Sequence, residues 1–196
     1  MLVSHISLAA GWIIYCILHS VLASQWLKKL TVTVLKSQFV YYRLYYTLFA
    51  LIGFVPLMWF QFTMPSPKLF TPTLFTKISG SALTLFGFFI MCICIRKYFL
   101  QLSGLKSLIQ EEKKDKLMIT GIHRYVRHPL YVGTFVFIWG LLLLFPTVSL
   151  FITNVIITVY TLIGISFEEK KLEQQFGEAY RTYKSKTPML IPAGKP

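Results

Sequence analysis

The residues best suited to chemistry lie in two short segments. The first, 120–133, reads T-G-I-H-R-Y-V-R-H-P-L-Y-V-G, and the second is the pair Glu168-Glu169. A proline after His128 belongs in the first turn of a helix, where its missing N–H costs nothing. The free amides of Leu130 to Val132 would then form an anion site, helped by Arg127. Because the glutamates could hold an ammonium group or sugar hydroxyls, the two segments together suit a zwitterionic, sugar-bearing ligand.

The order of the elements predicts that these two segments meet. Apolar blocks at about 130–145 and about 148–167 are separated by little more than Pro146 and Thr147, so we expect a tight antiparallel hairpin. Its polar end would bring two carboxylates beside a group of basic and aromatic side chains, namely His123, Arg124, Arg127, His128 and Tyr131. The alternative is that the basic residues only anchor a helix end and the glutamates only pair with them. Chemistry alone leaves both interpretations open.

Five uncharged or nearly uncharged apolar blocks predict membrane spans. A bilayer core about 30 Å thick needs about 20 helical residues. The blocks cover about Leu2–Ser24, Tyr41–Phe60, Phe75–Ile95, Leu130–Phe145 and Val148–Phe167. We therefore predict an all-α polytopic membrane protein with five transmembrane helices, a tight hairpin between the last two and an amphipathic C-terminal helix. It is expected to be one membrane domain over 1–196, with a three-helix part over 1–97 and a cofactor-binding hairpin and tail over 117–192.

The distribution of basic residues predicts the orientation. Eighteen of the 20 Lys and Arg fall in the links and tail on one side of the predicted spans, and only Lys68 and Lys77 fall on the other. By the positive-inside rule the amino terminus lies outside, and the tail and the site lie in the cytoplasm. An interfacial helix is expected from Tyr98 to Met118, ending in the charged run Glu111–Lys116. The tail from Glu168 is expected to continue the last span and fold back onto the bundle.

Composition argues against several other classes of protein. The net charge of +13 lies in the links between apolar blocks, so anionic membrane lipid is a better partner than nucleic acid. The three cysteines lie inside apolar blocks without a C-x-x-C pair, and no spacing typical of metal ligands is visible. We therefore expect an integral membrane protein, of a bacterial inner membrane type, with no metal and no nucleic acid partner.

A two-part motif resembles a known family. The run G-x-H-R-Y-x-R-H-P-x-Y-x-G, followed by E-E-x-x-L-x-x-x-F-G-x-x-Y-x-x-Y and Pro188 to Pro192, closely resembles membrane methyltransferases of the isoprenylcysteine carboxyl methyltransferase type, which include phospholipid, methanethiol and NnrU-like members. The resemblance covers about Leu117 to Pro192. It implies S-adenosylmethionine as cofactor and S-adenosylhomocysteine as product. It assigns cofactor binding to His123, Arg127, His128, Pro129, Tyr131, Gly133 and Glu169.

The acceptor of the methyl group is less well defined. A thiol or amine must lose a proton, for which Glu169 or Glu168 is the candidate acceptor. Carboxyl methyltransferases often carry arginine before the F-G of the tail, where this chain has Gln175. This departure weakens a prenylcysteine assignment unless Arg124 or Arg181 substitutes. Lipophilic or small thiol, lipid and carboxylate acceptors stay open, as do an NADPH-dependent membrane reductase of the sterol-reductase type and a non-catalytic membrane binding protein.

Overall fold

The computed structural model describes residues 1–102 and 117–192 of the chain. Within these ranges the regular elements are all helical, and the only β-pairing is an isolated bridge between Lys68 and Thr147. Among the described helices, four are long and apolar enough to cross a membrane, and a fifth apolar helix is shorter. This confirms the all-α class and a polytopic membrane character. The interfacial helix expected over Tyr98–Met118 falls for the most part, at 103–116, outside the described residues.

The chain forms two compact units, each assembled from separated stretches of sequence. Unit 1 contains 1–69, 98–102 and 147–156, and unit 2 contains 70–97, 117–146 and 157–192, counting the described residues only. The long helix α7, Val148–Phe176, contributes its first residues to unit 1 and the remainder to unit 2. The two units are described separately below.

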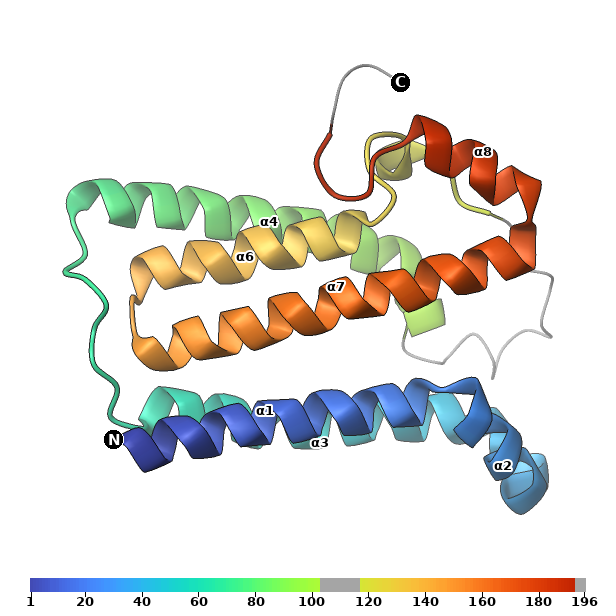
Figure 1. Cartoon of the computed structure of the whole chain (residues 1–196), viewed down its shortest axis with the longest axis horizontal. Coiled ribbons are helices and arrows are strands. Elements are labelled where there is room, and N and C mark those ends of the chain that lie inside the picture. Colours follow the sequence, from blue (N-terminus) through green and yellow to red (C-terminus); the bar gives the residue numbers. More distant parts are fainter. Residues whose placement is uncertain (103–116, 193–196) are drawn as a thin grey trace. The chain divides into compact units, whose positions relative to one another are not determined.

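Unit 1 is built on two long helices that lie side by side (Figure 1), α1 (Leu2–Ala23) and α3 (Tyr42–Thr63). Between them come α2 (Gln25–Leu35) and the 3-10 helix η1 (Lys36–Tyr41). Two glycines allow close packing of the long helices. A side chain added at Gly11 would meet Leu57 at 2.8 Å, and one at Gly53 would meet Tyr15 at 3.0 Å. The sequence predicted both spans but not α2.

Neutral polar side chains join the start of α7 to the rest of unit 1. The Ser149 amide donates to Ser66 Oγ at 2.9 Å, and the same hydroxyl lies 3.1 Å from His5 Nε2. The Thr153 hydroxyl donates to Gln61 Oε1 at 2.5 Å. We refer to these five residues as the neutral cluster. All except Ser66 are buried, and none is an acid or a basic residue other than the histidine.

In unit 2 the helices α4 (Leu74–Leu102) and α6 (Pro129–Leu144) pack through glycines. A side chain added at Gly87 would meet the Phe137 amide at 2.5 Å and the Gly133 carbonyl at 2.7 Å. One added at Gly140 would meet the Thr84 amide at 2.7 Å. Because the paired residue numbers rise on one helix as they fall on the other, α4 and α6 run antiparallel. The small residues let the two backbones approach each other closely.

The second part of α7 runs beside α6 in the opposite direction (Figure 1). The Trp139 indole donates to the Thr158 hydroxyl at 3.2 Å, and Tyr131 near the other end of α6 donates to Glu168 at 3.0 Å. Helix α7 continues to Phe176, well past the last apolar residue that we assigned to a span. Gly177, at φ 51°, then ends it and allows the chain to turn into α8 (Glu178–Lys186). This is the predicted fold-back of the tail.

Candidate functional site

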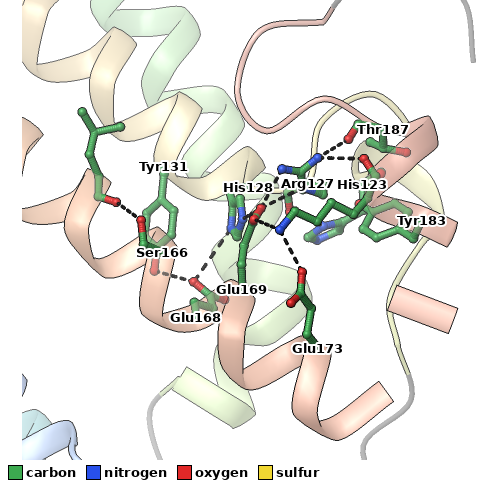
Figure 2. A network of polar contacts seen from close by, with 12 residues as sticks. His123, Arg127, His128, Tyr131, Ser166, Glu168, Glu169, Glu173, Tyr183 and Thr187 are labelled. Carbon is green, nitrogen blue, oxygen red and sulfur yellow. Dashed lines mark hydrogen bonds and ion pairs between the residues drawn. The ribbon is translucent and has the colours of Figure 1, made fainter. Parts of the chain in front are cut away.

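The polar groups of the two sequence segments meet in unit 2, at the N-terminal end of α6. The chain approaches α6 through the 3-10 helix η2 (Gly121–Arg124), and His128 is the residue before the helix with Pro129 in its first turn. On the neighbouring helix α7, Glu168 and Glu169 face this end. Figure 2 shows side chains from both segments, together with Tyr183 of α8, directed toward one another. The predicted convergence of the two segments is therefore present within unit 2.

Arg127 joins three parts of the chain through one guanidinium group. Its Nε and Nη2 atoms lie 2.8 and 2.7 Å from Glu169 Oε1. Its Nη1 atom donates to the backbone carbonyls of Lys184 at 3.1 Å and Thr187 at 2.5 Å, which lie at the C-terminal end of α8. Four donors of the planar group are thus used within the protein. Arg127 holds α8 against α7 and keeps little capacity for a ligand.

Glu169 is the centre of the charged contacts. It is 8% exposed, and its Oε1 atom also accepts from His128 Nε2 at 3.2 Å. Its Oε2 atom lies 3.1 Å from Lys184 Nζ. Burial by itself raises the pKa of the Glu169 carboxyl, but hydrogen bonds from Lys184, Arg127 and His128 outweigh it, so the pKa is lower than the ordinary value of 4.5. We refer to Arg127, His128, Glu169 and Lys184 as the ionic cluster.

Glu168 has a different environment from its neighbour. Its side chain is 44% exposed, and it accepts a hydrogen bond from the Tyr131 hydroxyl at 3.0 Å. His128 lies between the two glutamates, because its Nδ1 atom is 3.8 Å from Glu168 while its other nitrogen faces Glu169. The imidazole stacks on the Tyr131 ring, with centroids 5.7 Å apart. One carboxylate of the pair is therefore enclosed by cations, and the other is accessible.

The tail after α8 pairs with the segment before α6 through backbone groups. The Arg127 amide donates to the Pro188 carbonyl at 2.9 Å, and the His128 amide donates to the Met189 carbonyl at 3.2 Å. Within α8, the Tyr183 hydroxyl donates to the His123 carbonyl at 2.6 Å. These contacts explain why a proline-containing tail accompanies the Arg-His-Pro segment in the sequence motif: the tail fixes the backbone that carries both side chains.

Several predicted site residues lie outside the ionic cluster. Arg124 is exposed on η2, and no contact joins it to the cluster in the described parts of the chain. Gly133 lies against α4, so its lack of a side chain serves the approach of another backbone. The Val132 amide donates to the His128 carbonyl at 3.1 Å inside α6. Of the three amides predicted to form an anion site, that of Val132 is used within the helix. Those of Leu130 and Tyr131 remain the candidates.

Lys184 and Thr187 were not found by sequence reasoning. Lys184 bridges Glu169 and Glu173, the latter at 2.8 Å, and the hydrogen bonds that it donates to Glu173 and Glu169 raise its pKa. Nothing in their spacing indicates this, because Gly177 breaks the helical periodicity between Glu173 and Lys184. Thr187 takes part through its backbone carbonyl, which has no signature in a sequence. The position of α8 could be inferred only from the structure.

Tyr180 places a buried hydroxyl beside the ionic cluster. The residue is 1% exposed, and its hydroxyl has no partner within hydrogen-bonding geometry among the described residues. Burial raises the pKa of this hydroxyl, and the negative charge of Glu169 raises it further. Buried polar atoms normally have partners. The Tyr180 hydroxyl is therefore a group that could donate a hydrogen bond to a polar ligand.

Comparison with protein families identifies the class of the chain. The model of the phospholipid methyltransferase family matches residues 75–179, which include α4, α6, α7 and both segments of the polar site. The match covers more than half of the chain. The protein therefore belongs to the phospholipid methyltransferase family, which agrees with the predicted resemblance to membrane methyltransferases of the isoprenylcysteine carboxyl methyltransferase type.

Individual relatives match parts of the chain. The chain is 40% identical over 77 residues to a methanethiol S-methyltransferase of Crocosphaera subtropica, covering 39% of this chain and 29% of the relative. It is 38% identical over 84 residues to the protein-S-isoprenylcysteine O-methyltransferase of Schizosaccharomyces pombe, covering 42% and 36%. With the Xenopus laevis enzyme of that name, identity is 30% over 161 residues, covering 75% and 50%. The chain thus spans half or less of each of these relatives, and no solved structure gives a significant match.

Proposed function

We propose that the protein is a membrane methyltransferase that uses S-adenosylmethionine and transfers a methyl group to a lipophilic or small thiol, lipid or carboxylate acceptor. The observation that carries this proposal is the ionic cluster, which joins the Arg-His-Pro segment to Glu169. Its residues Arg127, His128 and Glu169 lie in the segment that the family model matches. Relatives from a bacterium, a yeast and a frog are all named methyltransferases. They favour methyl transfer over the alternative of a membrane reductase.

The residues present fit such a cofactor. A carboxylate that already attracts the ammonium of Lys184 is a suitable partner for the amino group of a zwitterionic ligand. The amides at the start of α6 suit its carboxylate end, since a helix N-terminus favours anions. The unpartnered Tyr180 hydroxyl is a donor for a further polar group. The cofactor, when bound, supplies an electrophilic methyl group on a positively charged sulfur.

Glu168 is the better candidate for accepting a proton from the nucleophile. Glu169 is held by three cationic or donor groups and its pKa is depressed, so it is a poor proton acceptor. Glu168 is accessible, and the Tyr131 hydroxyl donates one hydrogen bond that orients its carboxylate. A thiol acceptor would lose its proton to Glu168, whereas a carboxylate acceptor would need no base. Arg124, exposed on η2, is the candidate for contact with an anionic acceptor.

The membrane arrangement belongs to the same proposal. We infer five spans, in which α6 is the short fourth and forms a hairpin with the apolar part of α7. The basic links place the site and the tail on the cytoplasmic side. At this depth, charged groups are costly to bury and are commonly functional. A water-poor setting close to the lipid headgroups would let lipophilic acceptors reach the methyl group while water is excluded.

The decisive experiment is labelled methyl transfer by the purified full chain. Protein in lipid nanodiscs is given S-adenosylmethionine with a labelled methyl group and one acceptor at a time: an alkane thiol, phosphatidylethanolamine or a farnesylated cysteine analogue. We expect incorporation into one class, lost in Glu169→Gln and retained in Glu178→Gln, where the glutamate is 81% exposed on α8. Glu168→Gln should lower kcat for a thiol and keep cofactor affinity. Binding of S-adenosylhomocysteine without turnover on any acceptor would favour the non-catalytic alternative.

A further inference from the structure

Lys184 contacts other residues of the ionic cluster through both its side chain and its backbone. Its Nζ atom lies 3.1 Å from Glu169 Oε2 and 2.8 Å from Glu173 Oε1, so it bridges the two carboxylates. Its backbone carbonyl accepts a hydrogen bond from Arg127 at 3.1 Å. Because Gly177 reverses the chain, this arrangement brings a cation from α8 back onto the carboxylate that the proposed function assigns to the cofactor.

The contact of Lys184 with Glu169 is more exposed than that of Arg127 and uses a single nitrogen. Arg127 is 9% exposed and directs two nitrogens at Glu169, whereas the Lys184 side chain is 40% exposed and contributes a single ammonium. A lysine ammonium is a strongly hydrated point charge on a flexible stem, and half-exposed ion pairs contribute little free energy. Lys184 can therefore leave Glu169 at small cost while Arg127 stays in place.

An ammonium group on Glu169 Oε2 has the same chemistry as the amino end of an amino-acid-like ligand. Both carry one positive charge and N–H donors for a carboxylate oxygen. Glu173 offers Lys184 a second carboxylate, so a displaced lysine keeps an ion-pair partner. Glu169 and Glu173 therefore provide two adjacent carboxylates on α7. A lysine displaced from Glu169 can stay bound to Glu173.

We propose that Lys184 and the amino group of the bound cofactor compete for the same position on Glu169, and that Lys184 moves to Glu173 alone when the cofactor binds. This inference rests on the proposed function. Lys184 is then a positioning residue that keeps Glu169 compensated between turnovers. Because Lys184 competes with the cofactor, it lowers the apparent affinity of the protein for the cofactor. The size of the decrease is set by the fraction of molecules in which Lys184 occupies Glu169.

The test compares Lys184→Met with Lys186→Met, an exposed lysine on the same helix. The dissociation constant for S-adenosylhomocysteine is measured by titration calorimetry with the full chain in nanodiscs. We expect Lys184→Met to bind about threefold or more tightly than wild type, and Lys186→Met to be unchanged. Glu173→Gln removes the alternative partner of Lys184, so it should bind more weakly than wild type.

The sign of the effect separates competition from a purely structural role. Lys184→Met loses two ion pairs, so its melting temperature without ligand should equal that of wild type or fall below it. A structural lysine would give weaker binding together with lower stability. Unchanged or weaker binding by Lys184→Met, with normal binding by wild type, overturns the inference and leaves the proposed function standing. Absence of binding by wild type and all variants, with no methyl transfer, would overturn both.

Discussion

The ionic cluster of unit 2 and the neutral cluster of unit 1 both bury polar side chains in a largely apolar protein, but they differ in kind. The neutral cluster consists of hydrogen bonds such as Thr153 to Gln61, between groups that carry no charge and satisfy each other. The ionic cluster gathers two permanent cations and a histidine on one carboxylate, Glu169. Burying charges is far more costly than burying amides and hydroxyls. We propose that the neutral cluster joins helices, whereas the ionic cluster serves the binding of a ligand.

The largest expected effect is that of Glu169→Gln on stability. The change leaves the buried Arg127 guanidinium without its counter-charge, and breaking a buried pair from one side costs about 3 kcal/mol or more. We expect the free energy of unfolding in mixed micelles to fall by this amount. Glu178→Gln, which affects only an exposed pair, is the control. A loss below about 1 kcal/mol would show that the ionic cluster resembles a surface ion pair.

Arg127→Lys should have the next largest effect. The lysine keeps the charge but lacks the planar group that reaches Glu169 and the Lys184 and Thr187 carbonyls together. We expect a loss of about 2 kcal/mol in the free energy of unfolding, since the carbonyls at the end of α8 lose a charged donor. Limited proteolysis should then cleave the tail after α8 faster than in wild type. Equal cleavage rates would contradict the assigned role.

Acid should weaken the ionic cluster selectively. The pKa of Glu169 is lower in the folded protein than its ordinary value of 4.5, so the unfolded chain binds the proton more tightly. The stabilisation is therefore fully present above about pH 4.5 and is lost as the pH falls through the folded-state pKa. Unfolding measured from pH 7 to pH 3 should show this loss in wild type and in Gln61→Leu. Glu169→Gln should show a flatter profile, and an identical profile would contradict the assignment.

The smallest effect is expected in the neutral cluster. Gln61→Leu removes the acceptor of the Thr153 hydroxyl, and a hydrogen bond between membrane helices is worth about 0.6 kcal/mol. We expect a decrease of this size in the free energy of unfolding, with no change in affinity for S-adenosylhomocysteine. A loss of affinity comparable to that of Glu169→Gln would remove the distinction between the two clusters.

The sequence predicted the features that depend on local patterns of residues. It did not predict the contacts that depend on how distant segments pack. Apolar block lengths were enough to predict the long apolar helices, though not α2, and the order of the elements predicted that Glu168 and Glu169 lie near the Arg-His-Pro segment. They could not distinguish the two glutamates, because adjacent residues on a helix point in different directions and only packing decides which is enclosed. The contribution of Lys184 depends on the turn at Gly177, and that of Thr187 on a backbone carbonyl.

Calorimetric titration of the purified full chain with S-adenosylhomocysteine tests the central claim most directly. The claim is that Glu169 and the Arg-His-Pro segment hold one cofactor molecule. We expect saturable binding with one site per chain in wild type and in Gln61→Leu. Glu169→Gln, and Arg127→Lys as a variant that keeps the charge, should bind at least about tenfold more weakly, a difference of 1.4 kcal/mol. Absence of binding by folded wild-type protein, or equal affinity in all four proteins, would contradict the account.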